Sequence, residues 1–222
     1  MITLSIDTAS HNCAVALVED SKVLARISET IGKGHAERLI GQISTVMDRA
    51  KKSLKQIDRI AVNIGPGSFT GVRIGVATAR ALALALEKPA IGVSSLEAIG
   101  YETQKMFPDN NVIAVIDAGR GLVYRQDFAS GCTPIGSAEL QNSDDFSIAN
   151  NDNAILAGPF ALNLGEKIGL SKDRIHSFDA PDVVTYAILS ETKTTDCAAK
   201  PLYLRDADAK PQSAQPLIRK EI

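Results

Sequence analysis

A glycine-rich turn between an apolar strand and an apolar helix constrains the fold of this chain more than any other feature. The run GPGSFTG occupies residues 65–71, between a strand expected at Ile60–Ile64 and a helix expected at Val72–Leu86. It is not a phosphate loop, because Val72 and Arg73 stand where a lysine and a hydroxyl residue are needed. Thr70 replaces the third glycine of a dinucleotide fingerprint. Two interpretations remain: an anion site at the helix N-terminus, or, as we favour, a sharp turn into a tightly packed helix.

Three β-rich runs open the chain, and helices and strands then alternate. The spacing of apolar residues predicts an amphipathic helix at His35–Ala50. The remaining elements expected in this half are strands at Ile2–Ile6, Cys13–Val18, Val23–Ser28, Arg59–Ile64 and Ala90–Val93, and a helix from Ser95 to Lys105. This order indicates a mixed sheet with helices packed on it.

The second half begins by repeating the first. Strands expected at Val112–Ile116 and Leu122–Phe128 flank a small turn after Asp117, as the first two strands flank the turn after Asp7. The two aspartates lie 110 residues apart, half of the chain, which a duplicated domain would give. After Ser130 only short elements are expected, at Ala154–Leu156, Phe160–Ile168 and Val183–Leu189, so the second half is predicted to be reduced.

Five segments carry a family resemblance. GPGSFTGVRIG, IDTAS, VSSLEAI, VIDAGRGLVY and KPLYLRDADAKPQ together resemble the TsaB (YeaZ) family from Met1 to about Gln212. The chain departs from the family at Gly119, where a second arginine is common, and at Pro159-Phe160, where a second glycine-rich turn is expected.

The resemblance implies an α/β fold of the actin/Hsp70-like (ASKHA) class, with duplicated ribonuclease H-like domains of mixed sheet and helices. Residues 1–106 would form the domain with the glycine-rich loop and the interface helices, residues 107–205 the reduced domain, and residues 206–222 a flexible tail. The implied function is that of a non-catalytic dimerisation subunit in the bacterial complex that transfers a threonylcarbamoyl group to N6 of adenosine 37 in tRNA. The implied partners are the catalytic paralogue TsaD and the ATPase TsaE, with tRNA bound only through the complex and a homodimer when the chain is alone.

Small residues along the helix Val72–Leu86 predict a close approach of another helix. Gly71, Gly75, Ala79 and Ala83 recur every four residues, and apolar side chains surround this stripe. Burial inside one domain and contact with a partner helix both fit the pattern, and the resemblance favours the partner. The predicted partner interface comprises Arg38, Leu39, Gln42, Ile43, Met47, Gly71, Gly75, Ala79 and Ala83.

A nucleotide cleft between the two halves is the main alternative. In actin-like ATPases and sugar kinases, an Asp at the end of the first strand of each half frames the phosphates. Here Ala9 stands where such a turn carries glycine, so we favour Asp7 and Asp117 as turn-forming residues. The residues that would line a vestigial cleft are Asp7, Thr8, Gly65, Gly67, Ser68, Thr70 and Asp117.

Neither catalytic residues nor a cofactor or metal site is expected. No two of His11, His35 and His176 have the spacing that places two imidazoles on one helix face. By resemblance, Ser95 and Ile99 replace the metal-binding histidines of the catalytic paralogue. A small-molecule kinase would need a working Asp7/Asp117 cleft, and a peptidase would need a nucleophile that the sequence does not present.

Composition points to a cytoplasmic protein that does not bind nucleic acid by itself. The net charge is −2 and the isoelectric point about 5.9, so no bulk attraction draws the chain onto RNA. Three cysteines at unrelated spacings fit reduced thiols. A secretory leader is not expected, and the apolar stretch Ile74–Leu86 is too short to span a bilayer.

Overall fold

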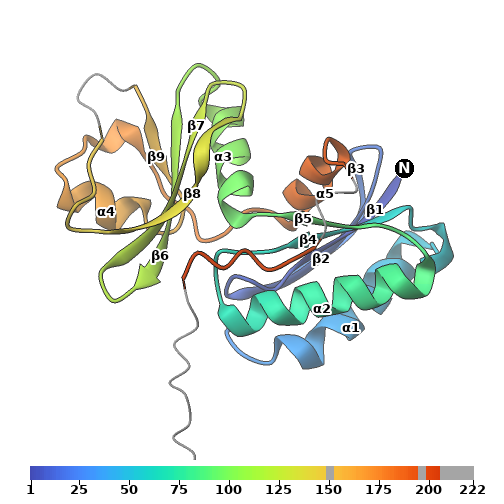
Figure 1. Cartoon of the computed structure of the whole chain (residues 1–222). Helices are drawn as coiled ribbons and strands as arrows, with labels where there is room; N and C mark the ends of the chain where they lie inside the picture. The colour runs from blue at the N-terminus through green and yellow to red at the C-terminus, as the bar shows by residue number, and fades with distance from the viewer. Residues whose placement is uncertain (149–152, 195–198, 206–222) are drawn as a thin grey trace, which may run out of the picture.

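The computed structural model describes residues 1–148, 153–194 and 199–205, and it consists of two five-stranded sheets with helices (Figure 1). Strand order is β3-β2-β1-β4-β5 in the first sheet and β10-β9-β6-β7-β8 in the second. In both sheets the first three strands pair antiparallel and the last two add in parallel. The predicted duplication is therefore present in the topology.

The first half contains the longer helices. Its strands are β1 (Ile2–Asp7), β2 (Asn12–Glu19), β3 (Lys22–Thr30), β4 (Arg59–Asn63) and β5 (Ala90–Val93). Its helices are α1 (His35–Ala50), α2 (Phe69–Leu86) and α3 (Ser95–Met106), with a 3₁₀ turn at Leu54–Gln56. Helix α2 starts three residues before the predicted Val72, because Ser68 caps it by accepting a hydrogen bond from the N–H of Gly71.

The second half repeats this order in shorter form. Its strands are β6 (Val112–Gly119), β7 (Leu122–Ala129), β8 (Thr133–Asn142), β9 (Ile155–Ala157) and β10 (Ile175–His176). Its helices are α4 (Ala161–Lys167) and α5 (Val183–Glu191), with a 3₁₀ turn at Lys172–Arg174. The described part of the segment between β8 and β9 holds no counterpart of α1, and α4 has 7 residues where α2 has 18. The second half is therefore smaller in its helices than the first, as the sequence predicted.

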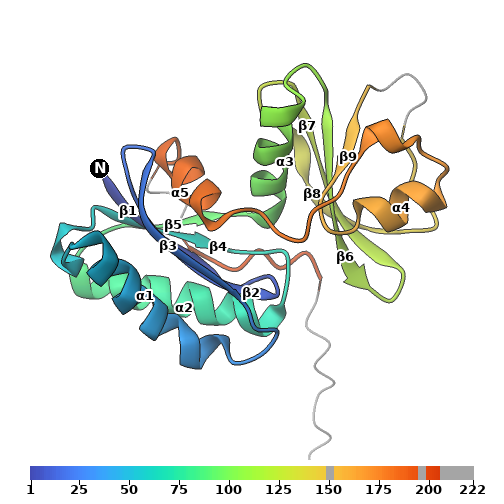
Figure 2. The ribbon, with the colours of Figure 1, turned by 180° about the vertical axis from the view of Figure 1, so that it is seen from behind.

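The last helix of each half packs on the sheet of the other half. Helix α3 covers β6 and β7, with Leu96 and Ile99 in one apolar cluster with Ala114 and Phe128. Helix α5 returns to the first sheet, where the Ser5 hydroxyl donates to the Val183 carbonyl at 2.6 Å. Figure 2 shows the exchange from behind. If the chain is divided after residue 106, the first sheet is separated from α5 and the second sheet from α3, the helices that pack on them.

The central strands β1 and β4 of the first sheet are buried on both faces. Leu4 and Ile6 of β1 point to the face covered by α1 and α2, in one cluster with Leu39 and Val76. The opposite face has smaller side chains, and the alanines of β2 at positions 14 and 16 contact Val183 and Ala187 of α5. Small residues on this face let α5 approach the sheet closely.

Two strands, β8 and β10, were not predicted. No strand was expected between Phe128 and Ala154 or after Leu156, yet β8 pairs with β7 along Leu122–Ala129 and β10 pairs with β9. Strand β8 is an edge strand with mostly exposed residues, and Pro134 and Gly136 lie within it, so it lacks the apolar alternation that identifies a half-buried strand. The tail predicted at 206–222 lies outside the described residues.

Candidate functional site

The glycine-rich loop is packed against the turn that follows β1. A Cβ atom on Gly67 would overlap the carbonyl oxygen of Ala9, and one on Gly71 would overlap that of Thr8. The N–H of Ser68 donates to Ala9 O at 2.7 Å, and the Thr8 hydroxyl donates to Gly71 O at 2.7 Å. Backbone atoms thus fill the space between these two turns. The sequence-based preference for a tightly packed turn over an anion site is consistent with this geometry.

Asp7 is the hydrogen-bonded centre of a buried polar network below this turn. Its Oδ1 accepts from the Ala9 N–H at 2.9 Å and from the Asn63 side-chain amide at 2.8 Å. Asn63 also donates to the Tyr186 hydroxyl, and its Oδ1 accepts from Ser95 Oγ at 2.9 Å. Burial raises the pKa of Asp7, although the Ala9, Asn63 and Ser10 hydrogen bonds oppose the shift. Burial also raises the pKa of Tyr186 well above its usual range, and the nearby carboxylate of Asp7 adds to the shift.

Asp117 occupies the equivalent place in the second half, but it is exposed. Its Oδ1 accepts from the Gly119 N–H at 2.8 Å, which is the same turn as that of Asp7 with Ala9. Both aspartates therefore form the turns that the sequence analysis favoured. A cavity of about 710 Å³ lies between the halves, and Gly67, Ser68 and Asp117 line it, whereas Asp7 and Thr8 are not among its lining residues.

Most of the predicted small-residue stripe lies inside the first half of the chain. Gly71, Gly75 and Ala79 are buried in the chain's own core: a Cβ on Gly75 would stand 2.6 Å from Thr8 Oγ1 and 3.4 Å from Val62. Ala83 is half-buried against the same core. The pattern could not show which side of an apolar helix meets its own sheet.

The α1 part of the predicted interface is also mostly internal. Leu39, Ile43 and Met47 belong to the buried core of the first half. Gln42 is 5% exposed, and within the described residues neither polar atom of its side chain has a hydrogen-bond partner. Arg38 is exposed and lies 3.6 Å from a carboxylate oxygen of Glu29.

A different face of α1 and α2 is open to solvent. Ile40 on α1 is 60% exposed and Leu84 on α2 is 83% exposed, and Ala77 and Ala81 of α2 are exposed as well. Among the described helices, α2 alone is long and apolar enough to pass a test for a membrane span, with a mean hydropathy of 1.4 over 18 residues. The core helix of a water-soluble protein can pass the same test, so one such helix is weak evidence for a membrane span.

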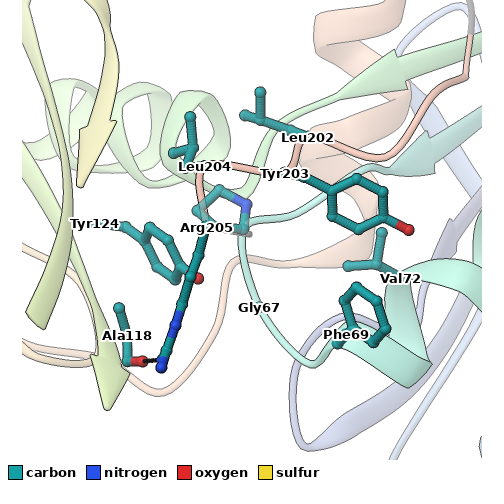
Figure 3. Close-up of a pocket in the computed structure, with 10 residues that line it drawn as sticks. Gly67, Phe69, Val72, Ala118, Tyr124, Leu202, Tyr203, Leu204 and Arg205 are labelled. Atoms are coloured by element: carbon teal, nitrogen blue, oxygen red, sulfur yellow. Dashed lines mark hydrogen bonds between the residues drawn. The ribbon is translucent and has the colours of Figure 1, made fainter. Parts of the chain in front are cut away.

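The C-terminal segment 199–205, here called the strap, completes the surroundings of the loop. The Leu202 N–H donates to Ile64 O at 2.8 Å, and Arg205 Nη1 donates to Ala118 O in the second half at 2.9 Å. Tyr203 lies against Phe69, and a cavity of about 290 Å³ opens between the strap, the loop and Tyr124 (Figure 3). The sequence of this segment does not predict its position, since nothing local indicates that it returns to residue 64.

Metal ligands are not gathered anywhere in the described ranges. No group of three His, Cys, Asp or Glu side chains that could hold an ion occurs there. Ser95 and Ile99, which replace the paralogue's histidines by resemblance, are both buried, and Ser95 bonds Asn63. His35 and His176 lie on opposite halves of the protein.

The two sheets have equivalent strand orders, the two halves exchange a helix, and an Asx turn follows the first strand of each half. These features define a class of protein: the two-lobed α/β proteins of actin/Hsp70-like fold. Within it, the chain is similar to YeaZ from Pseudomonas aeruginosa, with a TM-score of 0.79 at 26% identity over 91% of this chain and 99% of that one. A family model described as TsaD, tRNA N6-adenosine threonylcarbamoyltransferase, matches residues 23–147.

Relatives then identify the family. The chain is 40% identical over 124 residues to the tRNA threonylcarbamoyladenosine biosynthesis protein TsaB of Escherichia coli (strain K12), covering 56% of this chain and 53% of that protein. It is 31% identical over 142 residues to TsaB of Buchnera aphidicola subsp. Schizaphis graminum, covering 64% and 67%. The matches span about half to two thirds of the length of these relatives. The chain belongs to the TsaB (YeaZ) family.

Proposed function

We propose that this protein is a non-catalytic dimerisation subunit of the bacterial complex that attaches a threonylcarbamoyl group to N6 of adenosine 37 in tRNA. It pairs with a TsaD-like catalytic paralogue and supports a TsaE-like ATPase, in the cytoplasm. The names of its relatives, which are tRNA threonylcarbamoyladenosine biosynthesis proteins, support the pathway.

The observation that carries the subunit role is the open apolar face of α1 and α2. Ile40 and Leu84 are the most exposed large apolar side chains of these two helices, and small alanines lie beside Leu84. Exposed apolar side chains on neighbouring helices are a common basis of helix–helix association. The docking face is therefore assigned to Ile40, Ala77, Ala81 and Leu84, in place of the buried stripe.

The closed glycine loop supports a role without nucleotide chemistry. A kinase of this fold would have to hold phosphates between the turns after β1 and β6, and the glycine-rich loop is packed against the first of these turns, where the Ser68 N–H donates to Ala9 O. The Asp7 carboxyl group already accepts hydrogen bonds from the Ala9 N–H and the Asn63 side-chain amide. These contacts would have to break before the cleft alternative could operate.

Co-purification with the paralogue tests the proposal. The tagged chain is co-expressed with the TsaD-like protein of the same cell, and the mass of the complex is measured. We expect a stable complex that forms threonylcarbamoyladenosine when the ATPase, tRNA and substrates are added, and no product or ATP hydrolysis from this chain alone. ATP turnover by the isolated chain that Asp7→Ala abolishes would support the kinase alternative instead.

A further inference from the structure

A cavity of about 480 Å³ lies at the C-terminal end of α2, between that helix and the strap. Small residues of three segments line it: Ala83 of α2, Ala90 of β5 and Ala199 of the strap. The Ala199 N–H donates to Ala90 O at 3.2 Å, and the Lys88 N–H donates to Ala83 O at 3.0 Å, so backbone hydrogen bonds hold the lining segments in place. The space is open because each of these three segments contributes only a methyl group to this part of its wall.

The cavity adjoins the docking face of α1 and α2. Leu84, which is 83% exposed, belongs to the docking face and also lines the cavity. Ala77, Arg80, Ala81 and Leu84 are all exposed and follow one another at three- and four-residue spacings, so they share one side of α2. A partner that covers this side of the helix therefore reaches the mouth of the cavity.

The rim of the cavity is positively charged. Arg80, Lys88 and Lys200, here called the rim cations, line the cavity together with one acidic residue, Glu87. In the part of the chain that the structure describes, none of the three rim cations lies within ion-pair distance of a carboxylate. This local excess of positive charge belongs to a chain whose net charge is −2.

We propose that the cavity receives a large apolar side chain of the protein partner, and that acidic side chains next to it in the partner pair with the rim cations. The inference rests on the proposed function, because the cavity and the docking face share Leu84. An apolar anchor in a pocket, surrounded by a polar rim, is a common arrangement at the centre of protein interfaces. The anchor supplies affinity, while complementary charges accelerate association and fix the orientation of the partner.

Charge reversal tests the pairing at the rim. The double variant Arg80→Glu with Lys200→Glu keeps Lys88, because a cation beside the C-terminus of α2 stabilises the helix itself. Its control, Lys22→Glu with Lys172→Glu, makes the same charge change at exposed lysines on β3, the opposite edge of the first sheet, and in the second half.

Binding of each variant to the TsaD-like partner is measured by biolayer interferometry over a salt series. We expect the rim variant to bind about tenfold more weakly than the parent at low salt, mainly through slower association. The loss should shrink as salt rises from about 50 mM to about 500 mM, because ions screen the charge pairs. The control should bind like the parent, and both variants should keep the melting temperature of the parent, since all four substituted residues are exposed.

A photo-cross-linking residue tests the chemistry of the partner. p-Benzoylphenylalanine is placed at position 200 beside the cavity or, as the control, at position 172. The assembled complex is irradiated, and the cross-linked peptides are sequenced by mass spectrometry. We expect position 200 to label a partner peptide in which a large apolar residue has an Asp or Glu within about four residues, the distance of one helical turn. Position 172 should not label that peptide.

Several outcomes would overturn the inference while the complex still forms and the proposed function stands. Rim and control variants that bind the partner equally would do so, as would a labelled peptide without acidic residues. Weaker tRNA binding by the rim variant with normal partner binding would assign the cations to RNA instead. If the parent chain forms no complex with the TsaD-like protein, the proposed function itself is wrong.

Discussion

Gly71 at the start of α2 lies directly against the carbonyl oxygen of Thr8 at the end of the first strand, so a side chain at position 71 has no room. The Thr8 hydroxyl closes the contact from the other side by donating to Gly71 O. This pair joins the turn after β1 to the turn after β4. The glycine therefore serves packing within the chain.

Gly71→Ala tests this contact. We expect a loss of about 3 kcal/mol in the free energy of unfolding, because the new methyl group meets backbone that cannot rotate away. For a chain of this size that corresponds to a melting temperature about 6–12 °C lower. Gly41→Ala in α1 is the matched control: nothing lies within 4 Å of its added Cβ, so it should stabilise the helix by up to about 1 kcal/mol. A variant at position 71 that melts with the parent would contradict the packing role.

Leu84→Glu tests the docking face of α1 and α2. The side chain is 83% exposed, so thermal stability should change little, while binding to the TsaD-like partner should weaken at least tenfold as a charge enters an apolar contact. Ala79→Leu should have the opposite effects. It should lower the melting temperature, because residue 79 is buried in the core, and it should change partner binding little. Ile135→Glu on the exposed edge strand β8 controls for an apolar-to-acid change elsewhere. Unchanged partner binding by the position-84 variant, measured by biolayer interferometry, would remove this face from the interface.

Asp7→Asn tests the burial of a carboxyl group. Because burial raises the pKa of Asp7, the folded chain holds this proton to higher pH than the unfolded chain does, and ionisation of the group therefore costs stability as the pH rises from about 4. The asparagine side chain of the variant has no ionisable proton in this pH range. The free energy of unfolding of Asp7→Asn minus that of the parent should therefore increase between pH 4 and pH 7. Urea unfolding at several pH values measures this difference.

Asp7→Ala separates charge from hydrogen bonding at the same position. It removes the acceptor of the Ala9 N–H and of the Asn63 amide, so it should destabilise the protein at every pH in the series. A difference between Asp7→Asn and the parent that does not vary with pH would contradict the proposed cost of ionisation.

The local patterns of the sequence predicted elements well and predicted surfaces poorly. The amphipathic spacing of His35–Ala50 gave the bounds of α1 as the structure has them, and the repeated Asp turn gave the duplication. The stripe of Gly71, Gly75 and Ala79 lies in the chain's own core, and the sequence could not indicate this because a helix that is apolar all round does not show which face its own sheet takes. The strap could not be placed, since its contact with Ile64 joins residues far apart in sequence.

No local sequence pattern predicts that α3 and α5 each pack on the sheet of the other half. A truncated chain tests whether this exchange is needed for folding. Residues 1–106 contain every strand of the first sheet but lack α5, so the face with Ala14 and Ala16 would lose Val183 and Ala187. In the same fragment α3 would lose the second sheet, including the ring of Phe128, which packs so closely on Gly100 that an added Cβ would stand 2.8 Å from it. We expect this fragment to show no cooperative thermal transition by circular dichroism and to be cleaved rapidly by protease. Residues 1–205, which keep all described elements, should unfold in one transition like the full chain. If the fragment 1–106 unfolds cooperatively by itself, the first half is an independent domain and the exchanged helix α5 is not needed to complete it.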